Sequence, residues 1–220
     1  MRWTIERHTG RAADHLALPP AEGPEVRILD VIRPAVIMGS GQAESTLDAG
    51  RAAAAGVDIV RRPSGGGAVL VVPGEALWID VFVPAGDRLW VDDVGVAFHW
   101  LGEAFTEALA TIGVEARWHD GPMRNTPWSK VVCFAGLGPG EVIDPAGRKL
   151  VGFSQRRTRS HARFQCCALL RWDPAAMVAL LAEPYPEKAS AADLAAVATG
   201  IGPERGAPFV TALTEVFATL

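Results

Sequence analysis

Residues 61–69, with the sequence RRPSGGGAV, combine groups that can bind an anion. Consecutive glycines at 65–67 carry a high cost in conformational entropy, so their presence between apolar stretches indicates close backbone approach or positive φ. Free amides in such a loop can cradle a phosphate or a carboxylate. Arg61, Arg62 and Ser64, just before the glycines, would add charge-assisted and hydroxyl hydrogen bonds. The alternative is a glycine-rich hairpin with two solvated arginines. The spacing matches neither a dinucleotide fingerprint nor a P-loop.

Lys149 is a second residue that could act directly on a reacting group. If residues 149–155 form a strand, Lys149 shares a face with Val151, Phe153 and Gln155. A surface lysine does not need such apolar neighbours. A partly buried ammonium group can stabilise negative charge that develops in a transition state. The alternative is a lysine that extends from an edge strand into solvent.

Cys133 is the third candidate, and two interpretations of it stay open. It follows two valines and precedes Phe134, which is typical of a cysteine that serves as a small buried hydrophobe. A thiolate is also a strong nucleophile, and a nearby ammonium group would favour its formation. The three cysteines show no disulfide or zinc spacing, so we expect reduced thiols and no metal site.

A sheet flanked by helices is needed to position these residues, and the chain has the patterns for one. We expect strands over residues 2–6, 26–39 with a bend at Pro34, 57–62, 76–83, 140–143, 149–155 and 163–172, with a hairpin turn at 144–147. We expect helices over residues 11–18, 44–56, 92–113 with Asp92 as its cap, 174–181, 190–200 with a Ser190 and Asp193 capping box, and 208–220, and a loop over 183–188. No repeat or linker divides the chain, and so we expect one α/β (α+β) domain over 1–220 with a mixed or antiparallel central sheet.

Composition narrows the class of protein further. Apolar residues make up 49% of the 220 residues and charged residues 21%, as in ordinary globular domains. No apolar run approaches the roughly 20 residues that span a bilayer, and the N-terminus has no secretory pattern. A formal net charge of −4 disfavours a nucleic-acid binder with a broad basic surface. We therefore expect a cytoplasmic protein that binds neither membranes nor nucleic acids.

Three segments in a fixed order carry a resemblance to a known family: PAVIMGSGQ at 34–42, RRPSGGGAV at 61–69 and GRKLVGFSQRR at 147–157. Together they resemble the catalytic core of lipoate-protein ligases, octanoyltransferases and biotin-protein ligases, and are most similar to the lipoate branch. The resemblance implies the fold that biotin and lipoate ligases share with class II synthetases.

The resemblance also implies an activity and a set of site residues. The glycine loop would close over an acyl-adenylate, and Lys149 would touch the acyl carbonyl and the phosphate. The implied substrates are ATP with Mg²⁺, lipoate or octanoate, and a lysine of a lipoyl domain. The implied binding residues are Gly39, Gln42, Arg61, Arg62, Ser64, Gly65, Gly66, Gly67, Ala68, Val69, Gly152 and Ser154.

Departures from the family pattern leave two other functions open. After the glycine loop the family typically has a histidine-aspartate pair and a Gly-Asn, which residues 70–75 of this chain lack. The family also usually has His-Gly after the glutamine that corresponds to Gln165, where this chain has Cys166 and Cys167. Cys133 and Phe134 resemble the Cys-Phe element of octanoyltransferases that accept the acyl group from an acyl carrier protein without ATP. A protein of this fold that binds an acyl group or adenylate without catalysis is the third possibility.

Overall fold

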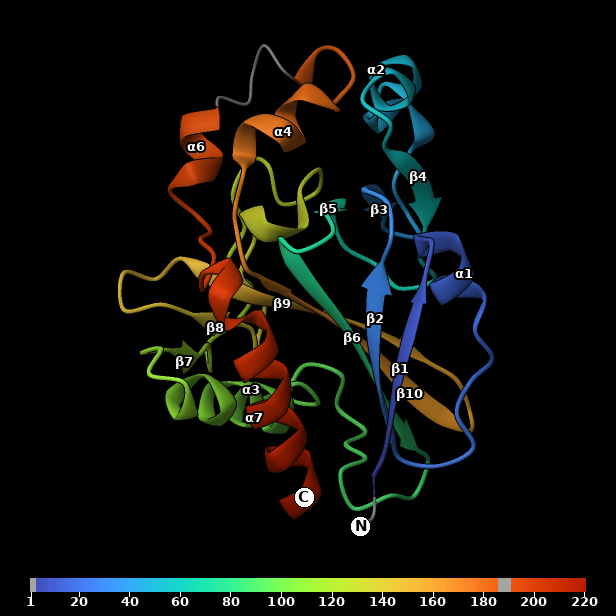
Figure 1. The fold of residues 1–220 in the computed structure, drawn as a ribbon, viewed down its shortest axis with the longest axis vertical. Helices are drawn as coiled ribbons and strands as arrows, with labels where there is room; N and C mark the ends of the chain where they lie inside the picture. The colour runs from blue at the N-terminus through green and yellow to red at the C-terminus, as the bar shows by residue number, and fades with distance from the viewer. Residues whose placement is uncertain (1–2, 186–190) are drawn as a thin grey trace.

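Two sheets form the centre of the molecule. The computed structural model describes residues 3–185 and 191–220. The large sheet has the order β1-β2-β6-β10-β9-β8-β7 and the small sheet the order β4-β3-β5 (Figure 1). The strands are β1 (Thr4–Gly10), β2 (Glu25–Val31), β3 (Ala35–Met38), β4 (Asp58–Arg61), β5 (Val69–Val71), β6 (Ala76–Pro84), β7 (Arg117–Trp118), β8 (Val142–Ile143), β9 (Lys149–Arg157) and β10 (His161–Leu169). Each sheet has one parallel pair, β1 with β2 and β3 with β4, which confirms the expected mixed sheet.

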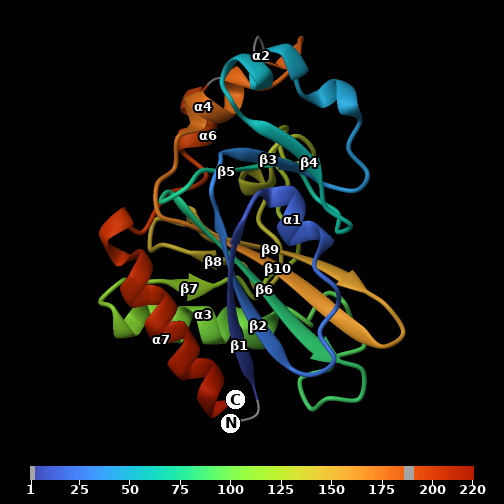
Figure 2. The same cartoon turned by 45° about the vertical axis from the view of Figure 1, so that its right-hand side comes forward.

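Two helices, α3 and α7, cover one face of the large sheet, and the small sheet packs against the other. The helices are α1 (Ala12–Ala17), α2 (Ala49–Ala54), α3 (His99–Thr111), α4 (Pro174–Ala179), α6 (Ala191–Ala195) and α7 (Gly206–Thr219). Helices α3 and α7 lie together at the lower part of the sheet (Figure 2). Phe105 of α3 packs against Phe153 of β9, and Phe209 of α7 packs against Phe105. On the other side, Ile37 and Val71 of the small sheet pack with Trp78 of β6. The space between the two sheets is therefore lined by apolar side chains.

Local signals correctly located several elements. Pro34 separates β2 from β3, as expected of a residue that cannot donate to a ladder. In the hairpin between β8 and β9, the amide of Gly147 donates to the carbonyl of Asp144 over 2.9 Å, and Gly147 has a φ of 84°. Asp173 caps α4 by accepting a hydrogen bond from the amide of Ala176.

Three expected helices are shorter than the sequence pattern indicated. The helix expected over 190–200 ends at Ala195, because the chain turns at 196–197 (α6, Ala191–Ala195). The prediction that a helix begins after Asp92 is wrong, because its carboxylate accepts from the indole of Trp90 over 2.8 Å instead. The Asp93 carboxylate then closes a turn on the amide of Gly95, and α3 begins only at His99. The expected helix over 44–56 is divided into the 3₁₀ turn η1 (Glu44–Thr46) and α2, because the Asp48 side chain caps a new start at the amide of Arg51.

Two strands have boundaries that differ from the expected ones, because pairing with a neighbouring strand sets their length. Strand β1 extends to Gly10 because it pairs along the whole length of β2. Strand β10 begins at His161, two residues before the expected start, since it pairs with the full length of β6. The expected Ser190 cap and residues 186–188 of the expected loop lie outside the described residues. None of the helices within 3–185 and 191–220 has the length and apolar character needed to cross a bilayer.

Candidate functional site

The two arginines before the glycines hold the backbone of the loop in place. Arg62 is 4% exposed, and its Nη1 donates to the Ile37 carbonyl over 3.0 Å. Its Nη2 donates to the carbonyls of Gly65 and Gly67, over 2.6 and 2.9 Å. Arg61 donates from Nη1 to the carbonyls of Gly39 and Gln42, over 2.9 and 2.7 Å. These guanidinium nitrogens therefore shape the loop, and Arg62 Nε is left without a partner among the described residues.

Close backbone contacts explain why glycines occupy the loop. A Cβ atom on Gly39 would lie 1.9 Å from the carbonyl oxygen of Gly66, and Gly66 itself has a φ of 98°. A Cβ atom on Gly67 would lie 2.7 Å from the amide nitrogen of Cys133. Within residues 3–185 and 191–220, the amides of Gly65, Gly66 and Gly67 donate to no other group. The loop thus carries the free amides that an anion-binding loop requires.

Gln42 and Ala68 join the loop to the segment that contains Cys133. The Gln42 Oε1 accepts a hydrogen bond from the Gly39 amide, and its Nε2 donates to the carbonyls of Lys130 and Val131. The Ala68 amide donates to the Val131 carbonyl, and the Cys133 amide donates to the Ala68 carbonyl, both over 2.8 Å. This pairing places Cys133 beside the glycines.

Lys149 is more deeply buried than the sequence indicated, at 2% exposure. Its Nζ lies 2.6 Å from Glu141 Oε2, donates to the Cys133 carbonyl over 3.1 Å and lies 5.4 Å from the centre of the Phe134 ring. The alternative of a lysine extended into solvent is therefore wrong. The ammonium group is charge-compensated and fixed at the start of β9.

Glu141 is a residue of the candidate site that sequence reasoning missed. Besides binding Lys149, its carboxylate accepts hydrogen bonds from the amides of Gly138 and Phe153, over 2.5 and 3.1 Å. These contacts hold a buried carboxylate that is only 5% exposed. The available signal was a lone acid after the two glycines of GPGEV, just ahead of the hairpin that leads to Lys149.

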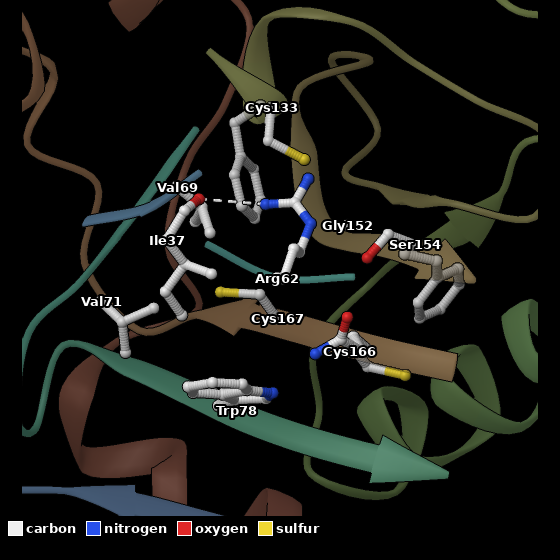
Figure 3. Close-up of a pocket in the computed structure, with 13 residues that line it drawn as sticks. Ile37, Arg62, Val69, Val71, Trp78, Cys133, Gly152, Ser154, Cys166 and Cys167 are labelled. Carbon is white, nitrogen blue, oxygen red and sulfur yellow. Dashed lines mark hydrogen bonds between the residues drawn. The ribbon is translucent and has the colours of Figure 1, made fainter. Parts of the chain in front are cut away.

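An apolar cavity of about 390 Å³ lies between the two sheets (Figure 3). Trp78 forms its floor in this view, and Ile37 and Val71 form one side. The full lining is Ile37, Arg62, Val69, Val71, Trp78, Cys133, Phe134, Gly152, Phe153, Ser154, Gln165, Cys166 and Cys167. Gly152 and Ser154 of β9 are thus brought to this cavity, as the resemblance implied.

One corner of this cavity is polar. The Ser64 hydroxyl donates to Gln165 Oε1 over 2.6 Å and lies 3.0 Å from the Ser154 hydroxyl. Gln165 is paired with Ser154 on one side and with Asp80 on the other. Asp80 is fully buried and ion-paired with Arg163, and burial raises the pKa of its carboxyl group. A row of polar side chains thus crosses the sheet below the glycine loop.

A second cavity, of about 610 Å³, lies on the other side of the glycine loop. Its lining comprises Gly65, Gly66, Gly67, Phe98, Met123, Ser129, Cys133, Gly138, Pro139, Glu141, Lys149 and Phe153. Cys133 and Phe153 line both cavities. An apolar space therefore adjoins a space with free amides and one ammonium group.

Comparison with known families agrees with this arrangement. The model of the lipoyl protein ligase A/B catalytic domain matches residues 14–202. The chain belongs to this family. No curated protein sequence matches the chain.

Solved structures of lipoate ligases share the fold. A bipartite lipoate protein ligase from Thermoplasma acidophilum, studied with its E2 lipoyl domain, superposes with a TM-score of 0.76 at 18% identity, covering 100% of this chain and 83% of that one. A putative lipoate protein ligase from the same organism with bound lipoic acid gives 0.68 at 20% identity, covering 99% and 84%. A lipoate-protein ligase A bound with ATP gives 0.68 at 18%, covering 100% and 85%.

The cysteines of this lipoyl protein ligase family member differ in accessibility. Burial raises the pKa of the Cys167 thiol to about 12 and raises that of Cys166 as well. Cys133 and Cys167 are both partly exposed, but Cys167 lines only the apolar cavity, whereas Cys133 lies where the two cavities meet. Of the three free thiols, Cys133 is the one placed for chemistry at the junction.

A protein-held Mg²⁺ does not fit the second cavity. Both oxygens of Glu141 are already committed to Lys149 and to backbone amides. Among the residues that the structure describes, no group of three His, Cys, Asp or Glu side chains could hold a metal. No step of the reaction is therefore assigned to a metal ion bound by these side chains.

Proposed function

We propose that the chain attaches lipoate, or a related medium-chain acid, to a lysine of a lipoyl domain by way of an acyl-adenylate. The observation that carries this proposal is the junction of the two cavities at Cys133 and Phe153. One cavity suits a hydrocarbon chain, and the other offers amides and an ammonium group to a phosphate. Residues of both sheets line the apolar cavity, which supports one catalytic domain over residues 1–220.

The acyl chain would occupy the apolar cavity. Its walls come from the apolar side chains of Ile37, Val69, Val71, Trp78 and Phe134. Gly152 leaves room in the wall, since a Cβ atom there would reach within 3.4 Å of Phe134 Cζ.

The nucleotide would occupy the second cavity, with its phosphate against the glycine amides. In the first step a carboxylate oxygen attacks the α-phosphorus of ATP, and pyrophosphate leaves. In the second step the amine of the acceptor lysine attacks the acyl carbonyl carbon, and AMP leaves with the electrons of the broken C–O bond. The Lys149 ammonium, held by Glu141, would stabilise negative charge on the carbonyl oxygen and the departing phosphate in both steps.

Relatives of the same fold support these assignments. One binds lipoic acid, a second binds ATP, and a third was solved as a lipoylation system with its E2 lipoyl domain. By likeness, the corresponding groups here are an acyl acid, ATP with its accompanying Mg²⁺, and a lipoyl domain as acceptor.

The position of Cys133 favours one alternative reaction. Its side chain lines both cavities, and its carbonyl oxygen accepts from Lys149 Nζ. The thiolate could attack the thioester carbonyl of octanoyl-acyl carrier protein, release the carrier thiol and keep the octanoyl group as a thioester on Cys133. The acceptor lysine would then displace the Cys133 thiolate, and no ATP would be used.

An intact-mass measurement on a lipoyl domain separates these functions. One arm supplies ATP, Mg²⁺ and lipoate or octanoate, and the other supplies octanoyl-acyl carrier protein without ATP. We expect modification in the first arm, its loss in Lys149→Ala, and unchanged modification in Lys130→Ala, which alters an exposed lysine. Modification only in the second arm, lost in Cys133→Ala, would replace the ligase with the transferase. Acyl binding without any mass change would indicate a protein that only binds.

A further inference from the structure

Two residues that line the apolar cavity each carry a buried hydrogen-bond donor without a partner in the described parts of the chain. They are Nε of Arg62 and Nε2 of Gln165, on side chains that are 4% and 6% exposed. Both residues line the cavity between the sheets. A buried donor without an acceptor is costly, so a ligand that brings an acceptor to this position gains the hydrogen bonds that the free protein lacks.

The orientation of both donors is fixed by their other contacts. The remaining guanidinium nitrogens of Arg62 bind the carbonyls of Ile37, Gly65 and Gly67. The Oε1 of Gln165 accepts from the Ser64 hydroxyl, which leaves its amide nitrogen free for the ligand. Arg62 Nε cannot reach another partner without breaking these contacts, and Gln165 Nε2 could do so only if its amide turned over to donate to the Ser64 hydroxyl.

We propose that Arg62 Nε and Gln165 Nε2 bind the carboxylate of the acid, with its hydrocarbon chain directed toward Ile37, Val71 and Trp78. This inference rests on the proposed function, since it takes a medium-chain acid as the ligand. Such an acid carries acceptors only at its carboxylate, whereas the rest of the cavity wall is mainly apolar. Gln165 thereby becomes a determinant of specificity for acids.

The position of this corner also suits the reaction. Ser64, which orients Gln165, directly precedes the glycine loop, and Phe153, next to Ser154, lines both cavities. A carboxylate held here would lie beside the passage to the second cavity. The two donors would therefore present the reacting end of the acid to the phosphate side.

Exchange of one donor for a negative charge tests the proposal. Gln165→Glu keeps an oxygen for the Ser64 hydroxyl and replaces the amide nitrogen with a second carboxylate oxygen. Calorimetry would compare octanoate with octylamine, which has the same chain length and a cationic head. The full-length protein should bind octanoate more tightly than octylamine, and Gln165→Glu should weaken octanoate at least about tenfold while favouring octylamine.

Gln155→Glu is the matched control, because it makes the same change on the neighbouring strand at a residue that lines neither cavity. It should leave the ratio of the two affinities unchanged. If Gln165→Glu does not fold, as judged by circular dichroism, Gln165→Met removes the donor without adding charge. That variant should weaken octanoate and leave octylamine unchanged.

Three results would overturn the inference: no octanoate binding by the unmodified protein, equal changes for both ligands in the Gln165 variant, or the same change in Gln155→Glu. Other results would refute the proposed function without refuting this inference. Reversed preference in Gln165→Glu without any acyl transfer by the unmodified protein would refute the enzyme and keep the carboxylate site. Acyl transfer by the unmodified protein, together with an unchanged preference for octanoate in Gln165→Glu, would keep the enzyme and refute the carboxylate site.

Discussion

Replacing Gly67 with alanine should disrupt the contact between the glycine loop and the segment that carries Cys133. The new Cβ atom would lie 2.7 Å from both the Cys133 nitrogen and the Val132 carbonyl carbon. These are backbone atoms, so no side-chain rotation can relieve the clash. The loop and residues 131–133 must move apart.

The expected loss of stability follows from what that movement breaks. Two hydrogen bonds of 2.8 Å, Ala68 amide to Val131 carbonyl and Cys133 amide to Ala68 carbonyl, span the contact. Each contributes about 0.5–1.5 kcal/mol, and overpacking a tight site costs about 1–3 kcal/mol. We therefore expect Gly67→Ala to lower the free energy of unfolding by about 2–6 kcal/mol.

Gly65→Ala is the matched comparison, two residues away in the same loop. A Cβ atom on Gly65 meets no atom within 4 Å, and its φ is not positive. Its free energy of unfolding should change by less than about 1 kcal/mol. Guanidinium unfolding of both variants, followed by tryptophan fluorescence, measures the difference. Equal stability of the two variants would refute the argument that close approach, rather than flexibility, requires glycine at 67.

Two further predictions concern the buried charges and thiols. Glu141→Gln leaves the Lys149 ammonium buried without its counter-ion and should cost about 3–5 kcal/mol in urea unfolding. The double variant with Lys149→Met should recover part of that loss but not the activity, whereas additive losses would show that the two side chains do not interact. In the folded protein at pH 8, iodoacetamide should modify Cys133 first, as read by peptide mass, because burial raises the pKa of Cys167 to about 12 and keeps its thiol protonated. Because its folded-state pKa lies above the ordinary thiol pKa of 9.0, Cys167 contributes stability below pH 9, and this stability is lost as the pH rises toward 12. Preferential modification of Cys167 at pH 8 would contradict this assignment.

Local sequence signals were sufficient for much of the fold. Alternating polarity over residues 76–83 located β6, and Gly147 marked the hairpin turn ahead of β9. Asp92 misled because aspartate binds nearby donors in many settings, and here the indole of Trp90 is its partner. The true start of α3 depends on packing against β7 and α7, which no local pattern encodes.

The site was located only in part for the same reason. The glycine loop and Lys149 were identified because their residue types are unusual in their local surroundings. Gln165 was not, since its partner Ser64 lies 101 residues earlier in the chain. Glu141 was also missed, because a single acid in a loop carries no signal of the buried lysine that it contacts.

The sequence by itself determined where the backbone requires glycine and where a lysine lies among apolar residues. Those properties belong to single residues and their neighbours. Only the tertiary structure decided what each group does: Arg61 and Arg62 bind loop carbonyls, Glu141 neutralises Lys149, and Gln165 keeps a donor free in the cavity. Hydrogen-bond partners are set by which strands become neighbours, and that is a property of the whole sheet.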